Sequence, residues 1–132
     1  MKSTVVMAFI ITVALFGAAA PGMAHHSSAM FDQSKTVTLE GVVKKWELTN
    51  PHSWLWVDVK GKDGKVVTWG FEAEGPSTLQ RAGIKPSDFK EGTKITITGN
   101  PMRNGEPAAI WVDAVRASDG KKFNPRAGFA VK

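Results

Sequence analysis

The chain has 132 residues, with 17 lysines and arginines against 12 aspartates and glutamates, and a formal net charge of +5 at pH 7. This length suits one small domain, and the absence of cysteine excludes a disulfide framework and a thiolate metal site. The basic residues are spread along the sequence rather than gathered in a stripe, which argues against nucleic-acid binding.

The first 24 residues are typical of a secretory signal peptide. Lys2 precedes an apolar run over 5–20, and Pro21 and Gly22 interrupt the chain before the small residue Ala24. The run is short for a membrane span, so we expect cleavage after Ala24 and a periplasmic or secreted protein without a stable membrane span. An uncleaved anchor is the alternative.

Five segments have the alternating apolar pattern and the flanking turn residues of β-strands. They cover 37–48, 53–60, 65–73, 93–99 and 108–117. The first is long, and its apolar residues change face at Gly41, which predicts a β-bulge or a sharp bend there. Proline and serine followed by a glycine predict a short helix over 75–83, and 85–92 is typical of a single helical turn.

This order of elements predicts an all-β fold, a small five-stranded OB-like barrel with a short helix between strands 3 and 4. The expected organisation has four parts: a signal peptide over 1–24, an N-terminal segment over 25–36, the OB-like barrel over 37–118 and a basic flexible tail over 119–132. A small open sandwich or a simple meander has a similar string of elements and remains the alternative.

Four segments carry a family resemblance: AHHSSAMFD, TLEGVVKKWELTNPHSWLWVDV, WGFEAEGPSTLQRAG and GTKITITGNP. Together they resemble a family of small exported bacterial proteins catalogued as domain of unknown function 6152. The likeness runs from His25 to about Phe123. It implies a signal peptide and one β-rich, OB-like domain, and it implies no catalytic residues. The resemblance therefore does not identify the function, and the individual residues are the remaining source of information about it.

Three histidines form a candidate metal site. If cleavage follows Ala24, the α-amine and imidazole of His25 chelate one ion, and His26 or His52 adds a third nitrogen. Nitrogen donors suit Cu(II), which also has the highest affinity among the first-row divalent ions. Cleavage one residue earlier also leaves a copper-binding start, with a histidine third from the amine. The alternative is that the His25–His26 pair is only a polar start and that His52 caps a turn.

The second predicted strand has two different faces. Alternation gives one face the core residues Leu55, Val57 and Val59, and gives the other His52, Trp54, Trp56 and Asp58. If the second face is open, Trp54, Trp56 and Asp58 form a ligand-binding surface. If the N-terminal segment around Met30 and Phe31 covers the tryptophans, it brings His25 and His26 toward the strand of His52. The covered arrangement is favoured because tryptophans are largely buried on average.

No nucleophile elbow, phosphate loop or metalloprotease motif is present, so the sequence favours a binding module over an enzyme. The leading interpretation is an exported β-barrel module that binds Cu(II) through its histidines. A second is an envelope module that recognises a glycan, a peptide or a partner protein through its aromatic face. A third is an oxidative copper enzyme with an N-terminal histidine brace.

Overall fold

Six β-strands and four short helical segments make up residues 28–129, the part of the chain that the computed structural model describes. In chain order they are η2 (Ser28–Met30), β1 (Val37–Glu47), β2 (His52–Lys60), β3 (Val66–Glu74), α1 (Pro76–Arg81), η3 (Pro86–Phe89), β4 (Lys94–Pro101), β5 (Ala108–Arg116), β6 (Lys122–Phe123) and η4 (Pro125–Phe129).

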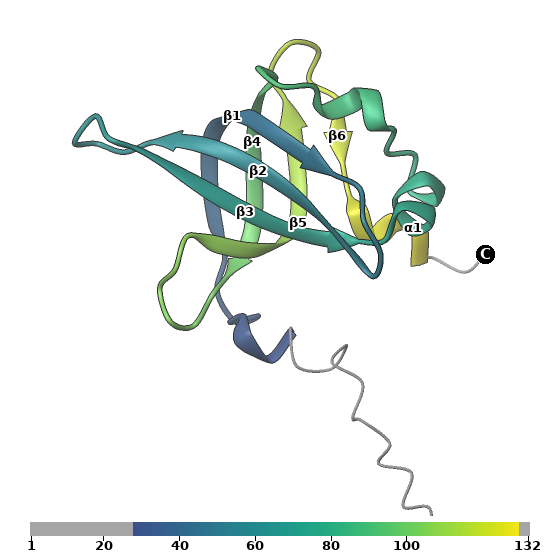
Figure 1. Cartoon of the computed structure of the whole chain (residues 1–132), viewed down its shortest axis with the longest axis horizontal. Helices are drawn as coiled ribbons and strands as arrows, with labels where there is room; N and C mark the ends of the chain where they lie inside the picture. The colour runs from purple at the N-terminus through teal and green to yellow at the C-terminus, as the bar shows by residue number, and fades with distance from the viewer. Residues whose placement is uncertain (1–27, 130–132) are drawn as a thin grey trace, which may run out of the picture.

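Five of these strands close into a barrel (Figure 1). Antiparallel pairs join β3 to β2, β2 to β1, β1 to β4 and β4 to β5. A parallel pairing of Gly70–Glu72 on β3 with Ala108–Ile110 on β5 completes the circuit. The only α-helix in the described part of the chain, α1, follows β3 and precedes β4. The predicted OB-like barrel is confirmed, and the open sandwich and the meander are wrong because the sheet closes on itself.

β1 is long because it pairs with two strands in turn. Its first half pairs with β4 as far as Val42, and from Val42 onward it pairs with β2. Gly41 lies at this change of partner, where an added Cβ would be 2.6 Å from the carbonyl oxygen of Asp58. The glycine thus permits a close approach of β1 to β2. The irregularity in the register lies between Val43 and Lys45, two residues beyond the predicted position.

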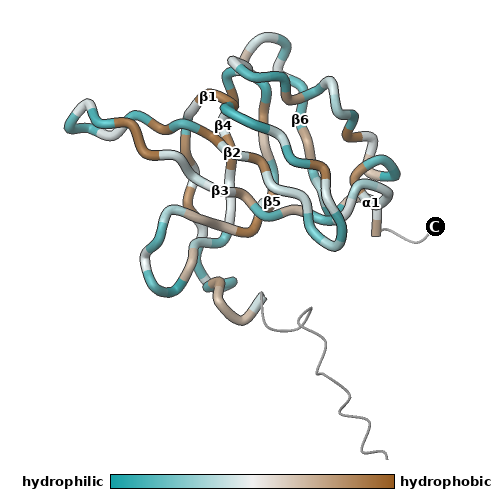
Figure 2. The backbone as a smooth tube through the Cα atoms, viewed as in Figure 1, coloured by the Kyte–Doolittle hydropathy of each residue, from teal (hydrophilic) through white to brown (hydrophobic). Residues whose placement is uncertain are grey.

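The barrel interior follows the alternation of the strands, and Figure 2 shows apolar and polar positions succeeding one another along them. The buried cluster takes residues from all five strands, and Phe89 of η3 and Leu79 of α1 close one end. Trp111 is 1 % exposed, and Trp46 and Trp69 pack against the cluster. Phe89 contacts Trp46 and Trp111 edge-on, with ring centroids 5.7 and 5.3 Å apart.

The C-terminal segment is not a loose tail as far as it is described. Lys122–Phe123 forms β6, which pairs with β5, and Pro125–Phe129 forms η4, which lies beside α1. Phe123 is 2 % exposed, and its ring centroid lies 4.7 Å from that of Phe89. The basic composition of this segment suggested flexibility, but the burial of Phe123 and Pro125 and the pairing of β6 with β5 hold it against the barrel.

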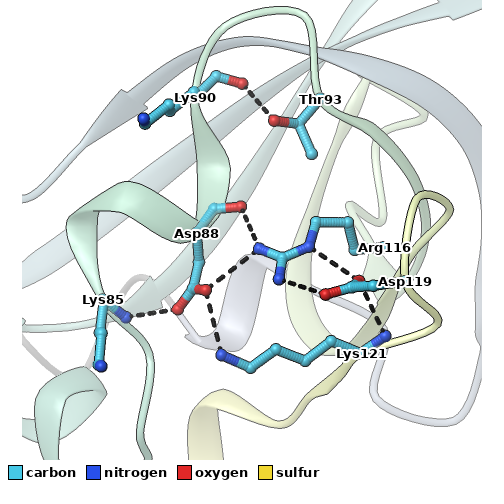
Figure 3. A network of polar contacts seen from close by, with 7 residues as sticks. All are labelled: Lys85, Asp88, Lys90, Thr93, Arg116, Asp119 and Lys121. Carbon is cyan, nitrogen blue, oxygen red and sulfur yellow. Dashed lines mark hydrogen bonds and ion pairs between the residues drawn. The ribbon is translucent and has the colours of Figure 1, made fainter.

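An ion-pair network fastens η3 to the end of β5 (Figure 3). Nη1 of Arg116 donates to both the carbonyl oxygen and Oδ1 of Asp88, each at 3.1 Å. Nε and Nη2 of the same guanidinium donate to the two carboxylate oxygens of Asp119 at 3.0 and 2.7 Å. Lys121 adds a hydrogen bond to Asp88, and the backbone N–H of Lys85 donates to the other oxygen of this carboxylate. The network thus ties the connection between α1 and β4 to the C-terminal segment.

Candidate functional site

β2 has one buried and one partly exposed face, as its alternation predicts. The buried positions are Ser53, Leu55 and Val57, and the outer positions are His52, Trp54, Trp56 and Asp58. Val59 was expected in the core, but it is half-buried and packs against the outside of the core cluster. All four predicted site residues of this strand therefore lie on the outer face of the β1–β2–β3 sheet, outside the barrel core.

His52 begins β2, and a carboxylate of β3 holds its imidazole. Nδ1 of His52 lies 3.2 Å from Oε1 of Glu72, and the two side chains are 31 % and 8 % exposed. A carboxylate at Nδ1 favours the tautomer that carries its proton there, which leaves the lone pair on Nε2. The turn before β2 is closed by Thr49, whose Oγ1 donates to the carbonyl oxygen of His52 at 2.7 Å. The turn is thus closed through the backbone carbonyl of His52, while the imidazole of this residue contacts Glu72.

A small cavity of about 120 Å³ adjoins the His52–Glu72 pair. Its polar lining comes from four separate parts of the chain: Ser28, Gln33, His52, Glu72, Glu74 and Arg126. Ser28 belongs to the N-terminal segment and Arg126 to η4, so the cavity lies where both chain ends meet the β2–β3 pair. His25 and His26 lie outside the described residues.

The N-terminal segment reaches this cavity because it is anchored beside the end of β4. Phe31 forms a β-bridge with Met102 and is 3 % exposed, and the backbone N–H of Asp32 donates to the carbonyl oxygen of Pro101 at 2.8 Å. Met30 is 50 % exposed, and among the described rings Phe31 contacts neither tryptophan of β2. The cover of the indoles by the N-terminal segment and the approach of His25 and His26 to His52 stay predictions, while Ser28 and Gln33 of this segment line the same cavity as His52.

Trp54 and Trp56 stack on each other, with ring centroids 5.6 Å apart and an angle of 18° between the planes. Gly70 of β3 lies opposite Trp56, and a Cβ at this position would be 2.8 Å from Cζ3 of that indole. The missing side chain thus lets the rings lie against β3. Nε1 of Trp56 donates to Oε2 of Glu47 at 3.0 Å, so the orientation of this indole is fixed by a hydrogen bond.

The carboxylates near the tryptophans are held by cationic and hydroxyl groups. Lys45 forms an ion pair with Glu47, and this hydrogen bond, together with that from Trp56, holds the pKa of Glu47 below its ordinary value. Oγ1 of Thr68 donates to Oδ1 of Asp58 at 2.6 Å, and Nζ of Lys44 donates to the same hydroxyl at 3.2 Å. Asp58 therefore belongs to a polar cluster at the far end of this face from His52.

The structure divides the predicted site residues into two groups. His52 lies with Glu72 beside the N-terminal segment, while Trp56 lies between two polar clusters. The apolar alternation of the strands does not identify Gly70 or Glu47 as site residues. The hairpin turn at 61–64 contains the necessary signal, because counting back from it along both strands places Gly70 opposite Trp56.

Within residues 28–129, no group of three or more histidine, aspartate and glutamate side chains is arranged to hold a metal ion. No helix in this part of the chain has the length and apolar character to cross a membrane.

Comparison with known proteins gives one match. No curated protein and no solved structure matches the chain significantly. A sequence model with the description "Family of unknown function (DUF6152)" matches residues 13–111, about three quarters of the chain. This is the family that the four sequence segments resemble, and the matched range includes the whole of β1, β2 and β3 and most of the outer-face residues described above. The chain therefore belongs to DUF6152, a family of unknown function.

Proposed function

We propose that the protein is an exported binding module that holds one Cu(II) ion between its N-terminal histidines and His52. The observation that carries this proposal is the cavity that brings Ser28 beside His52 and Glu72. His26 precedes Ser28 by two residues, and two residues of extended chain span at most about 7 Å. His25 is three residues from Ser28, about 10 Å of extended chain, so the chain is long enough for donors on both histidines to approach the imidazole of His52.

The surroundings of His52 suit a metal ligand. Histidines that bind metals usually donate their second ring N–H to a carboxylate, which fixes the tautomer and raises the basicity of the ligating nitrogen. Oε1 of Glu72 lies 3.2 Å from Nδ1 of His52, so Nε2 is the nitrogen that would bind the ion. The side chain is about one-third exposed, which leaves this nitrogen an approach from solvent.

The proposed donors select the metal. Cleavage after Ala24 would give His25 a free α-amine, whose ordinary pKa of about 7.7 to 8.0 leaves it partly deprotonated at neutral pH. An amine and imidazoles form an all-nitrogen set that suits Cu(II), while Zn(II) in structural sites usually takes four protein ligands. The leader pattern over 1–24 supports export, and export is what would expose this amine.

The test is a copper titration of the protein produced with its leader in a bacterial host and purified from the periplasm. We expect an intact mass that begins at Ala24 or His25 and one equivalent of Cu(II) bound at submicromolar affinity. The His25→Ala/His26→Ala double variant should lose tight binding, and His52→Ala should bind more weakly with one fewer nitrogen in its electron paramagnetic resonance spectrum.

A matched control is Gln33→Ala, which changes the lining of the same cavity without removing a proposed donor. Its affinity should equal that of the native protein. A mass that retains the leader, non-stoichiometric binding, or equal affinity in the native protein and the double variant would each overturn the proposal.

A further inference from the structure

A separate groove lies on the same sheet, around Trp56 and away from His52. A groove of about 600 Å³ is lined by Lys44, Lys45, Glu47, Trp56, Thr68 and Glu91. It shares no residue with the cavity beside His52, and its volume falls in the range of sites for small organic ligands. Nothing in the copper proposal uses these residues.

The indole of Trp56 forms the apolar part of this groove. Trp54 stacks against one face of Trp56, and Glu47 accepts the hydrogen bond of its Nε1. The ring is thus held in place by two strands before any ligand arrives. A flat, pre-oriented indole face offers large contact area at little cost in side-chain entropy.

Hydrogen-bonding groups flank the indole as two ordered clusters. The first joins Lys45 to Glu47 on β1. The second joins Lys44 of β1 through the hydroxyl of Thr68 to the carboxylate of Asp58. Each cluster contains both donors and acceptors, so the groove can receive a ligand that carries many hydroxyl groups in either role.

The charges of the groove narrow the class of ligand. Two lysines and two glutamates line it, so their formal charges cancel. A polyanion such as a nucleic acid would gain no net attraction here. Lysine and glutamate are also depleted from the centres of protein–protein interfaces, where aromatic residues predominate. An uncharged, hydroxyl-rich ligand with an apolar ring face can stack on the indole and form hydrogen bonds with the polar groups around it.

We propose that this groove binds a neutral carbohydrate. The apolar face of one pyranose ring stacks on the indole face of Trp56 that Trp54 leaves free. Its hydroxyl groups exchange hydrogen bonds with Lys45 and Glu47 at one edge and with Lys44 and Thr68 at the other. The inference does not depend on copper, because the two sites share no residue.

The test is affinity electrophoresis of the exported protein in native gels that contain neutral glucan, xylan or mannan, with polygalacturonate gels as the anionic comparison. At least one neutral polymer should retard the native protein. Trp56→Ala should weaken that retardation about tenfold, which corresponds to about 1.4 kcal/mol, since it removes the stacking surface. Thr68→Val, which leaves the indole in place, should weaken it as well.

Trp69→Phe is the matched control, because Trp69 packs against the barrel core and lies outside the groove. It should be retarded like the native protein, and circular dichroism should show the same fold for all variants. Absence of retardation in every neutral polymer, retardation by polygalacturonate alone, or retardation unchanged in both Trp56→Ala and Thr68→Val would overturn the proposal. Copper affinity measured on the same variants should not change, so failure of one proposal is distinguishable from failure of the other.

Discussion

His52 and Glu72 contact each other diagonally across the β2–β3 pair, with Nδ1 of the imidazole 3.2 Å from Oε1 of the carboxylate. Glu74 is the residue directly opposite His52, while Glu72 is opposite Trp54. Diagonal neighbours on one face of an antiparallel pair lie within reach of long side chains. The almost fully buried carboxylate thus fixes a partly exposed imidazole at the cavity that the N-terminal segment also lines.

This relationship predicts that Glu72→Gln weakens Cu(II) binding about tenfold, because loss of a partner that orients a ligand typically costs 10- to 100-fold in metal affinity. The glutamine keeps the shape of the side chain but removes its charge. Competition titration against a chelator of known affinity measures the change. Glu74→Gln, on the same strand and lining the same cavity, should stay within about twofold of the native protein. Equal affinities of the two variants would show that Glu72 does not position a copper ligand.

Gly70→Val should separate the two stacked indoles of β2. Its Cβ would lie 2.8 Å from Cζ3 of Trp56 and 3.3 Å from Cε3 of Trp54, distances that force the rings to move. Valine is well suited to a strand, so we expect the barrel to form. The exciton couplet of the stacked pair in circular dichroism should fall, and retardation by the neutral polysaccharide should fall with it. An unchanged couplet would contradict the role assigned to this glycine.

The ion-pair network predicts a loss of stability in acid. The hydrogen bonds from Arg116 lower the pKa of Asp119 to about 2. Burial by itself would raise the pKa of Asp88, but hydrogen bonds from the Lys85 backbone, Lys121 and Arg116 outweigh it and leave that pKa below its ordinary value. Both carboxyl groups therefore bind protons less readily in the folded chain than in the unfolded chain. Their contribution is complete above about pH 4 and is lost as the pH falls toward the folded values.

Urea unfolding from neutral pH down to about pH 2 measures this dependence. The free energy of unfolding of the native protein should fall in that acid range, and the fall should be shallower in Asp88→Asn and in Asp119→Asn. At neutral pH, Asp88→Ala should lower the free energy of unfolding by about 1 to 3 kcal/mol, since it leaves partners of a buried carboxylate without an acceptor. Identical acid profiles in the native and variant proteins would contradict the assignment.

Phe123→Ala should lower the free energy of unfolding by about 3 to 5 kcal/mol, because it removes a buried ring that packs against Phe89. Phe129→Ala is the control, since Phe129 is 55 % exposed and its loss should change stability by no more than about 0.5 kcal/mol. Chemical denaturation measures both. Equal stability of the two variants would contradict the contribution assigned to the contact of Phe123 with Phe89.

The amino-acid pattern alone predicted the five strands of the barrel, the helix between β3 and β4, and the division of β2 into a core face and an outer face. These features depend on residues that are neighbours in the chain, so alternation and turn chemistry are sufficient to predict them. The order of the elements then favoured the OB-like barrel, because few topologies accommodate a long first strand, a hairpin and a helix before the fourth strand.

The contacts between outer-face residues follow from the folded arrangement and are not visible in the sequence. The contact of His52 with Glu72, the place of Ser28 beside them and the position of Gly70 under Trp56 all depend on register and on the path of the N-terminal segment. A shift of one residue between β2 and β3 would change every one of these pairs while leaving each strand's own pattern intact. The C-terminal segment likewise packs on the barrel through the contact of Phe123 with Phe89. These residues are 34 positions apart, so local composition does not encode the contact.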